Sequence, residues 1–214
     1  MSLKKVYDKL FKELGPQNWW PGDSEEEIII GAILTQNTSW NNVEKAIRNL
    51  KKENLCDFGE LNNVEIQKLA KLVYSTGYYN QKAKRLKRIA SYFMKNPIIK
   101  FKSKPLADMR QDLLGINGVG NETADSILLY AFHKPMFVID NYTKRVFYRL
   151  GYLSKNISYV KAQDYFTESL PQSQELFNEF HALIVKFAKL NCQRKPNCQK
   201  CFMAKWCKYK QSRS

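Results

Sequence analysis

The stretch Leu113–Leu128, "LLGINGVGNETADSIL", decides the fold because a helical pattern ends, a glycine-rich turn follows, and a second helical pattern begins at once. Gly118 and Gly120 can adopt positive φ and allow another backbone to approach closely. Asn121 is the expected N-cap of the second helix, whose first N–H groups would point outward with a partial positive charge. Such a turn can bind a phosphate group without a basic side chain. Taken alone, the short Gly-Val-Gly pattern favours an ordinary connection between two helices.

Helical periodicity continues on both sides of this turn. Residues 25–52 repeat apolar side chains at helical spacing, and the polar stretch "TQNTS" at 35–39 interrupts them with helix-stopping and capping residues. Gly151 follows another such segment as a candidate C-cap. No alternation of period two is long enough for a sheet. The sequence therefore predicts an all-α fold, with room for two helical lobes.

Composition and charge limit what such a fold can do. The 214 residues are enough for one large domain or two small ones, and 44% of them are hydrophobic, so a sizeable core can form. Lys and Arg outnumber Asp and Glu by 35 to 20, which gives a net charge of +15. Such an excess favours a polyanionic partner, most often nucleic acid, over a merely solvated basic surface or an anionic membrane face.

The chain carries no segment that suggests a membrane. No apolar run approaches the roughly 20 residues that span a bilayer. The N-terminal "MSLKKVYDKLFKEL" is typical of an amphipathic helix and lacks the apolar core of a signal peptide. A cytoplasmic location is therefore expected, where stable disulfides are rare.

Four of the five cysteines fall in the segment 191–207, "NCQRKPNCQKCFMAKWC". Five residues separate Cys192 from Cys198, two separate Cys198 from Cys201, and five separate Cys201 from Cys207. Four thiols at this spacing could form two disulfides, bind a zinc ion or hold an iron–sulfur cluster. The expected compartment disfavours disulfides, and the choice between the two metal sites stays open at this point.

One acid stands out upstream of the cysteines. Asp140 lies in "PMFVIDNYTKRVFYRLG" (residues 135–151), directly after the apolar run 136–139. Such an acid either caps the helix that follows or faces a cleft, and taken singly the cap is favoured.

The hairpin, the Asp140 segment and the four terminal cysteines together resemble the helix-hairpin-helix DNA glycosylases of the endonuclease III superfamily, over nearly the whole chain. The resemblance implies a six-helix, barrel-like domain at residues 23–132 with the hairpin at 113–128. It implies a second helical domain, made of residues 1–22 and 133–214, that ends in a cluster loop at 192–207. It further implies an acid, here Asp140, in the cleft between two lobes, a hairpin that grips DNA, and a [4Fe-4S] cluster. Carried over onto this sequence, the hairpin residues are Gly118, Val119, Gly120 and Asn121, and the cluster ligands are Cys192, Cys198, Cys201 and Cys207.

Two positions depart from the family pattern. The first cysteine gap is one residue shorter than the common spacing, which a loop tolerates, so the cluster stays favoured over zinc. Glu122 stands where bifunctional members carry a lysine that forms a Schiff base with the sugar, and a carboxylate cannot form an imine. The resemblance then implies a monofunctional glycosylase of base excision repair, in which Asp140 stabilises an oxocarbenium-like state or activates water.

Aromatic segments indicate the target base. "WWP" (19–21), "GAILTQNT" (31–38) and "GYYNQKAKRL" (77–86) resemble the type III bacterial branch of 3-methyladenine DNA glycosylases. The likeness implies a stacking pocket for a positively charged alkylated purine, made by Trp20, Pro21 and Trp40 with Trp19 beside them. It also implies a wedge, Tyr78 or Tyr79, that fills the gap left by a flipped base, with Gln36 or Asn37 on the opposite strand. Lys82 and Lys195 are basic residues expected at the DNA backbone.

The expected partner is double-stranded DNA with a flipped damaged base, bound by a monomer. Two alternatives stay open. One is an endonuclease III-like or mismatch glycosylase that acts on oxidised or mispaired bases, and the other is a DNA-binding module without catalysis.

Overall fold

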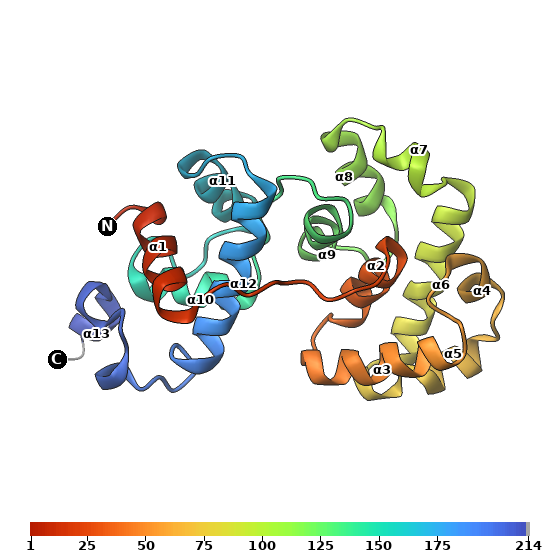
Figure 1. The fold of residues 1–214 in the computed structure, drawn as a ribbon, viewed down its shortest axis with the longest axis horizontal. Coiled ribbons are helices and arrows are strands. Elements are labelled where there is room, and N and C mark those ends of the chain that lie inside the picture. The colour runs from red at the N-terminus through yellow and green to blue at the C-terminus, as the bar shows by residue number, and fades with distance from the viewer. Residues whose placement is uncertain (213–214) are drawn as a thin grey trace. The chain divides into compact units, whose positions relative to one another are not determined.

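The computed structural model describes residues 1–212, and this part of the chain contains helices and no strand, which confirms the all-α fold. The chain forms two compact units (Figure 1). The central unit is Trp20–Lys134, and the terminal unit combines Met1–Trp19 with Pro135–Ser214.

The helices of each unit follow one another along the chain. The central unit contains α2 (Glu25–Leu34), α3 (Trp40–Lys52), α4 (Phe58–Asn63), α5 (Ile66–Leu72), η1 (Tyr74–Thr76), α6 (Tyr79–Lys95), α7 (Ile98–Lys102), α8 (Leu106–Gly115), α9 (Asn121–Ser126) and the π-helical turn η2 (Ile127–Ala131). The terminal unit contains α1 (Leu3–Leu14), α10 (Asn141–Leu150), α11 (Tyr159–Ser169), α12 (Gln174–Leu190), η3 (Cys198–Lys200), η4 (Ala204–Trp206) and α13 (Lys208–Gln211).

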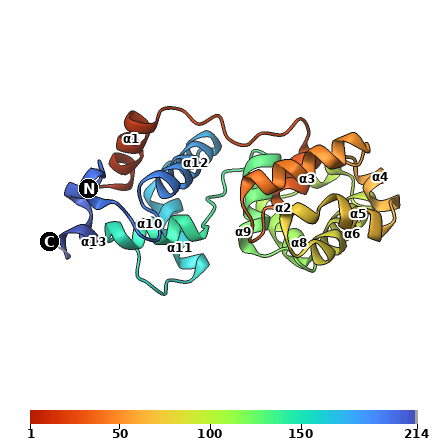
Figure 2. The same cartoon turned by 90° about the horizontal axis from the view of Figure 1, so that it is seen from below.

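The central unit is built around α2, which is apolar on nearly every side. Ile29, Ile30 and Ile33 are fully buried, and α2 packs against α6 and η2. Ser24 caps its start by accepting a hydrogen bond from the Glu27 N–H. On the other side of α6 lie α4 and α5, which run beside it in Figures 1 and 2.

The central unit has more helices than the six expected for the domain at 23–132. The extra ones are short: α4 has six residues and α7 has five. Each begins at a local start signal, because the Asp57 side chain caps α4 and Pro97 immediately precedes α7.

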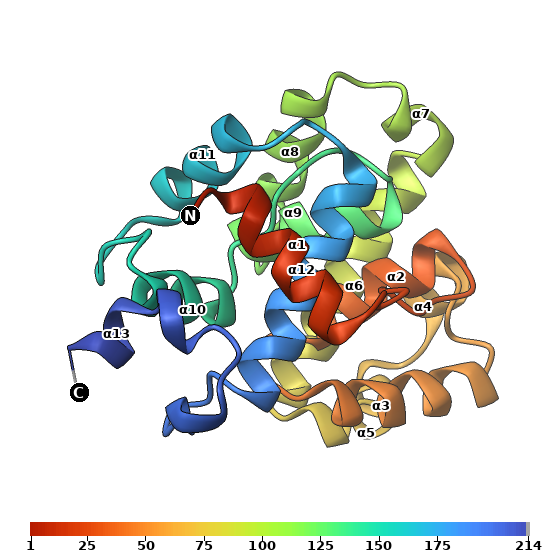
Figure 3. The same cartoon turned by 60° about the vertical axis from the view of Figure 1, so that its left-hand side comes forward.

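The terminal unit is built around α12, which packs against α1 and α10 (Figure 3). Five phenylalanine rings fill the space between α10, α11 and α12, and two of them, Phe137 and Phe166, stack with centroids 4.2 Å apart. All five are completely buried: Phe137, Phe147, Phe166, Phe177 and Phe180. Loss of one such ring costs about 3–5 kcal/mol, so this cluster fixes the positions of α10 and α12.

No helix in residues 1–212 has both the length and the apolar character needed to cross a membrane.

Candidate functional site

The hairpin between α8 and α9 forms at the predicted position, with one change in its capping. Gly118 has φ +99°, in the region that favours glycine. Gly120 has φ −101° and is the N-cap of α9, so Asn121 is the first residue of the helix and the expected Asn121 cap is wrong. Val119 is buried, and its N–H donates to the Ile116 carbonyl at 2.9 Å.

A buried ion pair holds the two helices of the hairpin together. The Arg110 Nε donates to Asp125 Oδ1 at 2.7 Å, and its Nη2 donates to Asp125 Oδ2 at 3.2 Å. Asp125 is fully buried, and the same guanidinium donates to the Asn121 Oδ1 at 3.0 Å. The Asn121 amide is therefore engaged inside the hairpin. Sequence reasoning missed this pair, because nothing in the spacing of the two residues shows that α8 and α9 face each other there.

Gln36 is tied to the same hairpin instead of projecting freely from its loop. Its Nε2 donates to the Gly118 carbonyl at 3.0 Å and to the Thr123 Oγ1 at 2.9 Å. Arg85 of α6 donates to the Gln36 Oε1, and its side chain lies over the open face of Gly118. Of the two residues expected to insert into the opposite strand, only Asn37 is exposed, with φ +53°.

Tyr78 and Tyr79 lie at the N-terminus of α6. Tyr78 has φ +47° and is 70% exposed, although bulky side chains rarely adopt that backbone conformation. Tyr79 is less exposed, and its ring packs on Tyr74 with centroids 4.7 Å apart.

Lys82 does not lie on the surface, so its expected contact with the DNA backbone is not supported by its position. The side chain is 1% exposed, and its Nζ donates to the Leu34 carbonyl at 2.8 Å and to the Thr76 carbonyl at 2.7 Å. Burial lowers the pKa of this ammonium to about 8. The "KAKR" pattern suggested a solvated basic face, but helical periodicity turns Lys82 inward.

The two tryptophans of the "WWP" segment belong to different units of the structure. Trp20, Pro21 and Trp40 line one cavity of the central unit, together with acidic and basic residues that include Glu44 and Lys51. The Trp20 ring meets the Trp40 ring edge to face at 4.9 Å, and the Trp40 Nε1 donates to the Glu44 carboxylate at 2.9 Å. Trp19 belongs to the terminal unit and does not line this cavity.

Asp140 is the N-cap of α10, and a histidine from α12 lies beside it. The Thr143 N–H donates to Asp140 Oδ1 at 2.6 Å, and the His181 Nε2 lies 3.6 Å from Oδ2. Both side chains are nearly buried, with 12% of Asp140 and 7% of His181 exposed. Burial acts to raise the pKa of Asp140, but His181 and Thr143 outweigh it and hold the pKa below its usual value. The carboxylate is therefore stabilised in its ionised form.

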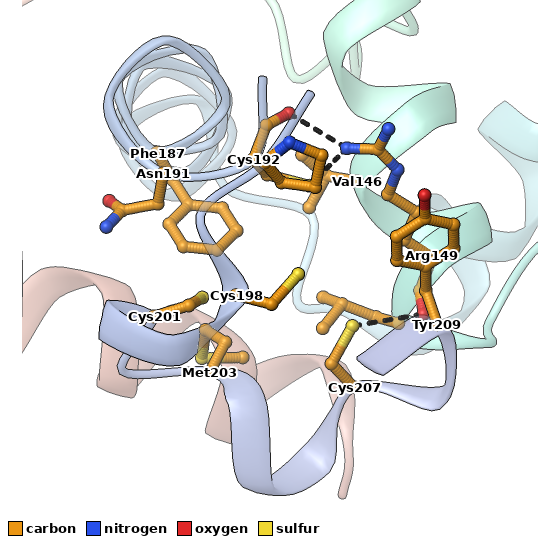
Figure 4. A pocket seen from close by; sticks show the side chains of 12 residues that line it. Val146, Arg149, Phe187, Asn191, Cys192, Cys198, Cys201, Met203, Cys207 and Tyr209 are labelled. Atoms are coloured by element: carbon orange, nitrogen blue, oxygen red, sulfur yellow. Dashed lines mark hydrogen bonds between the residues drawn. The ribbon is translucent and has the colours of Figure 1, made fainter. Parts of the chain in front are cut away.

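The four terminal cysteines line one cavity of the terminal unit. Cys192, Cys198, Cys201 and Cys207 surround it with Met203 and Tyr209, as Figure 4 shows. Burial, and to a smaller extent the other cysteines, raise the pKa of the Cys201 and Cys207 thiols.

Arg149 of α10 holds the first loop of this segment, a role that the sequence did not reveal. Its guanidinium donates to the carbonyls of Gln193 at 2.6 Å and Arg194 at 3.0 Å, and to the Cys192 Sγ at 3.3 Å. It also stacks on the Tyr209 ring at 4.8 Å. Lys195, by contrast, is exposed at the edge of the loop.

The cysteine cavity offers thiol donors but no preformed single-ion site within residues 1–212. Among the described residues, no three His, Cys, Asp or Glu side chains converge closely enough to hold one metal ion. Four cysteine thiols line the cavity, and this donor set is the one that iron–sulfur clusters use.

Comparison with known proteins places the chain in a family. Residues 30–172 match the model of the HhH-GPD superfamily base excision DNA repair proteins. The chain belongs to this superfamily. It is an enzyme of the DNA glycosylase class.

Three similar proteins show which branches of the superfamily the chain resembles. A Methanocaldococcus jannaschii protein named "Putative DNA repair glycosylase MJ1434" is 44% identical over 209 residues, which are 96% of this chain and 95% of that protein. An endonuclease III of Sulfolobus acidocaldarius is 30% identical over 187 residues, 85% of this chain and 80% of that protein. The solved H. pylori 3-methyladenine DNA glycosylase (MagIII), bound to 1,N6-ethenoadenine, has 29% identity and a TM-score of 0.78, covering 88% of this chain and 98% of the other. The chain therefore resembles both endonuclease III and the 3-methyladenine branch.

Proposed function

We propose that this protein is a monofunctional base excision repair glycosylase for alkylated purines of the 3-methyladenine type, and that it acts as a monomer on double-stranded DNA. The observation that carries the proposal is the aromatic cavity lined by Trp20, Pro21 and Trp40. Electron-rich ring faces attract a cationic base, and the Glu44 carboxylate held by Trp40 adds negative charge to the same cavity. The ethenoadenine bound to the H. pylori enzyme supports a purine.

Asp140 supplies the charge that the reaction needs. Breaking the N-glycosidic bond leaves positive charge on the deoxyribose, and an ionised carboxylate near C1′ stabilises that charge. The lowered pKa of Asp140, caused by His181 and Thr143 against the effect of burial, keeps the group ionised at neutral pH. A cationic alkylpurine already leaves easily, so no strong acid is required for the departing base.

A second chemical step through a Schiff base is not expected at the hairpin. Glu122 lies exposed in the first turn of α9, where bifunctional relatives carry the attacking lysine. The carboxylate cannot form an imine, and at a helix N-terminus it is favourable to the helix dipole. Water then completes the reaction.

DNA binding is assigned to groups on both units. The N–H groups at the Gly120 end of α9 suit a backbone phosphate. Tyr78, which is exposed and held in a left-handed conformation, is a better wedge than Tyr79, and Asn37 is the better candidate for the opposite strand. Lys195 adds a salt-sensitive phosphate contact from the cysteine loop.

The cysteine cavity is proposed to hold a [4Fe-4S] cluster on Cys192, Cys198, Cys201 and Cys207. When bound, the cluster crosslinks a loop that has little regular structure, and the buried Arg149 fixes the first part of that loop from α10. A brown protein with iron and sulfide in matching amounts is expected, and Cys198→Ala should lose the colour. Stoichiometric zinc in a colourless protein would overturn the assignment.

Base release from defined duplexes tests the substrate. Pure protein is incubated with duplexes that contain a 3-methyladenine analogue, ethenoadenine, thymine glycol or a G·T mismatch, and the freed base is measured. Release of the alkylated or etheno purine is expected. Release of thymine glycol or mismatched thymine without any purine would instead favour the endonuclease III-like alternative. Efficient borohydride trapping of an enzyme–DNA adduct would refute the monofunctional mechanism.

Asp140→Asn tests the catalytic assignment without removing the helix cap, because asparagine is as good an N-cap as aspartate. Base excision should be lost while DNA binding is retained or strengthened, since a negative charge near the phosphates is removed. Asp164→Asn is the matched control, because Asp164 is an exposed acid on α11 of the same unit. Unchanged excision by the Asp140 variant would leave the non-catalytic DNA-binding alternative.

A further inference from the structure

We propose that Lys82 is a positioning residue that fixes two DNA-inserting loops, Thr35–Ser39 and Tyr74–Tyr78, in one arrangement. The inference rests on the proposed function, because it takes the tips of these loops, Asn37 and Tyr78, as the residues that enter the duplex. Lys82 itself touches no DNA. It acts through the backbone of each loop.

The geometry of Lys82 joins two helix ends that are distant in sequence. Its Nζ lies 2.8 Å from the carbonyl of Leu34, the last residue of α2, and 2.7 Å from the carbonyl of Thr76, the last residue of η1. Carbonyls at helix C-termini lack helical partners and carry partial negative charge. A buried ammonium therefore satisfies both ends at once, and it fixes their separation in a way that an apolar side chain cannot.

Each bonded carbonyl lies two or three residues before a loop-tip residue with a positive φ. Asn37 follows Leu34 by three residues and has φ +53°, and Tyr78 follows Thr76 by two residues and has φ +47°. A non-glycine residue in this region is strained and persists only where its surroundings enforce it. Tyr78 is 70% exposed, so its side chain makes few contacts that could enforce the conformation. Its backbone is held on two sides: its carbonyl accepts from the Gln81 and Lys82 N–H groups at 3.0 Å, and the Lys82 ammonium binds the Thr76 carbonyl two residues earlier.

A second cation of α6 extends the same arrangement to the hairpin. Arg85 lies three residues after Lys82 and donates to Gln36, which in turn donates to the Gly118 carbonyl and to Thr123. The first turns of α6 thus connect both loops with the hairpin inside the central unit. Burying Lys82 without an acidic partner costs free energy, which is also why its pKa falls to about 8.

The test compares Lys82→Met with a matched variant on the same helix. Lys87 also lies on α6 and donates through Nζ to a single carbonyl, that of Asn62 at 2.7 Å, away from both loops. Both variants are bound to a duplex that carries an abasic-site analogue flanked by 2-aminopurine, whose fluorescence reports unstacking by an inserted side chain. Free energies of unfolding in urea and the salt dependence of binding to undamaged duplex are measured in parallel.

Lys82→Met should reduce the fluorescence change and the single-turnover excision rate about tenfold or more, the effect of losing charge-assisted hydrogen bonds that hold the loops. Its binding to undamaged duplex, and the salt dependence of that binding, should match the wild type. Lys87→Met should keep the fluorescence change, even where it lowers stability by a similar amount. In a Tyr78→Ala background, Lys82→Met should have much less effect, because the residue it positions is gone.

Three results would overturn the inference. The first is a normal fluorescence change in Lys82→Met, and the second is an equal loss in Lys87→Met, which would make the effect one of stability alone. The third is full additivity of Lys82→Met with Tyr78→Ala. Failure of the proposed function looks different, because the wild type itself would then give no fluorescence change, or would release a base other than an alkylpurine while the Lys82 effect persisted.

Discussion

Alanine substitutions at the two glycines of the hairpin should affect different properties: Gly118→Ala the stability of the protein, and Gly120→Ala its affinity for DNA. At Gly118, φ is +99°, and an added Cβ would lie 2.6 Å from the Arg85 Cγ. At Gly120, φ is −101°, which any residue adopts, and an added Cβ would have no heavy atom within 4 Å. Gly118→Ala therefore perturbs the protein itself, whereas Gly120→Ala places a methyl group where we propose that a phosphate approaches.

The structure sets the size of each effect. Gly118→Ala forces a left-handed alanine, at about 1–2 kcal/mol, and displaces Arg85 from Gln36, a charge-assisted hydrogen bond of about 1.5–3 kcal/mol. The free energy of unfolding should fall by about 2.5–5 kcal/mol. Gly120→Ala should change it by only about 1 kcal/mol, because alanine is a poorer N-cap than glycine but also restricts the unfolded chain. Its DNA affinity should nevertheless fall several-fold.

Urea unfolding and fluorescence-anisotropy binding to a duplex with an abasic-site analogue measure the two quantities. Hydrogen exchange of the amides in 106–131 shows whether the loss of stability in Gly118→Ala is centred on the hairpin. Equal destabilisation by the two substitutions would refute the assigned backbone conformations. Unchanged DNA affinity in Gly120→Ala would refute the phosphate site at the start of α9.

Three further outcomes follow from buried charges. Arg110→Met should lower the free energy of unfolding by about 3–5 kcal/mol, because it leaves the fully buried Asp125 carboxylate without its cation. Asp125→Asn should cost less, because 22% of the Arg110 side chain is exposed and water can solvate it. Urea titrations in which Asp125→Asn costs more than Arg110→Met would contradict this order. His181→Leu removes the main influence that opposes the pKa-raising effect of burial on Asp140. The pKa of Asp140 should therefore rise, and the acid limb of the kcat/KM profile should move to higher pH. An unmoved acid limb would show that His181 does not act on the carboxylate. The pKa of Asp140 is held below its usual value in the folded protein. The contribution of Asp140 to stability is therefore complete above the pKa of an unfolded aspartate and is lost as pH falls through the folded pKa. His181→Leu should flatten this dependence of the unfolding free energy on acidic pH.

Local rules were enough to predict several of the helix ends. The "TQNTS" break between α2 and α3, the Gly151 C-cap with φ +91° and the Asp140 N-cap all depend on residues within one turn of the feature. The Asn121 cap failed because Gly120 offers an extended backbone one residue earlier, and the Asn121 side chain finds a partner in Arg110 instead. Competition for a side chain by a distant residue is not visible in a sequence window.

The contacts that arrange the site lie beyond such a window. Gln36 and Gly118 are 82 residues apart, and Lys82 and Leu34 are 48 apart. A lysine in a basic run is typical of a solvated surface, and only the burial of one side of α6 shows that Lys82 points inward. The sequence could name residue types suited to DNA, but it could not tell which of them face solvent.

The buried charges of this protein share one property: most of them bind backbone at the end of a helix or in an irregular segment. Lys82 binds the carbonyls that end α2 and η1, Arg149 binds three consecutive residues of the cysteine loop, and Asp140 accepts from the Thr143 N–H in the first turn of α10. Apolar packing positions helices well, but it cannot satisfy the free N–H and C=O groups where helices end. A glycosylase acts through loops and helix ends, since those are the parts that can approach a phosphate or a flipped nucleotide. Charges buried behind these segments hold them in place without occupying the surface that DNA must reach. This is why Lys82, and not a more exposed lysine of α6, is the residue whose loss should separate insertion into DNA from binding to it.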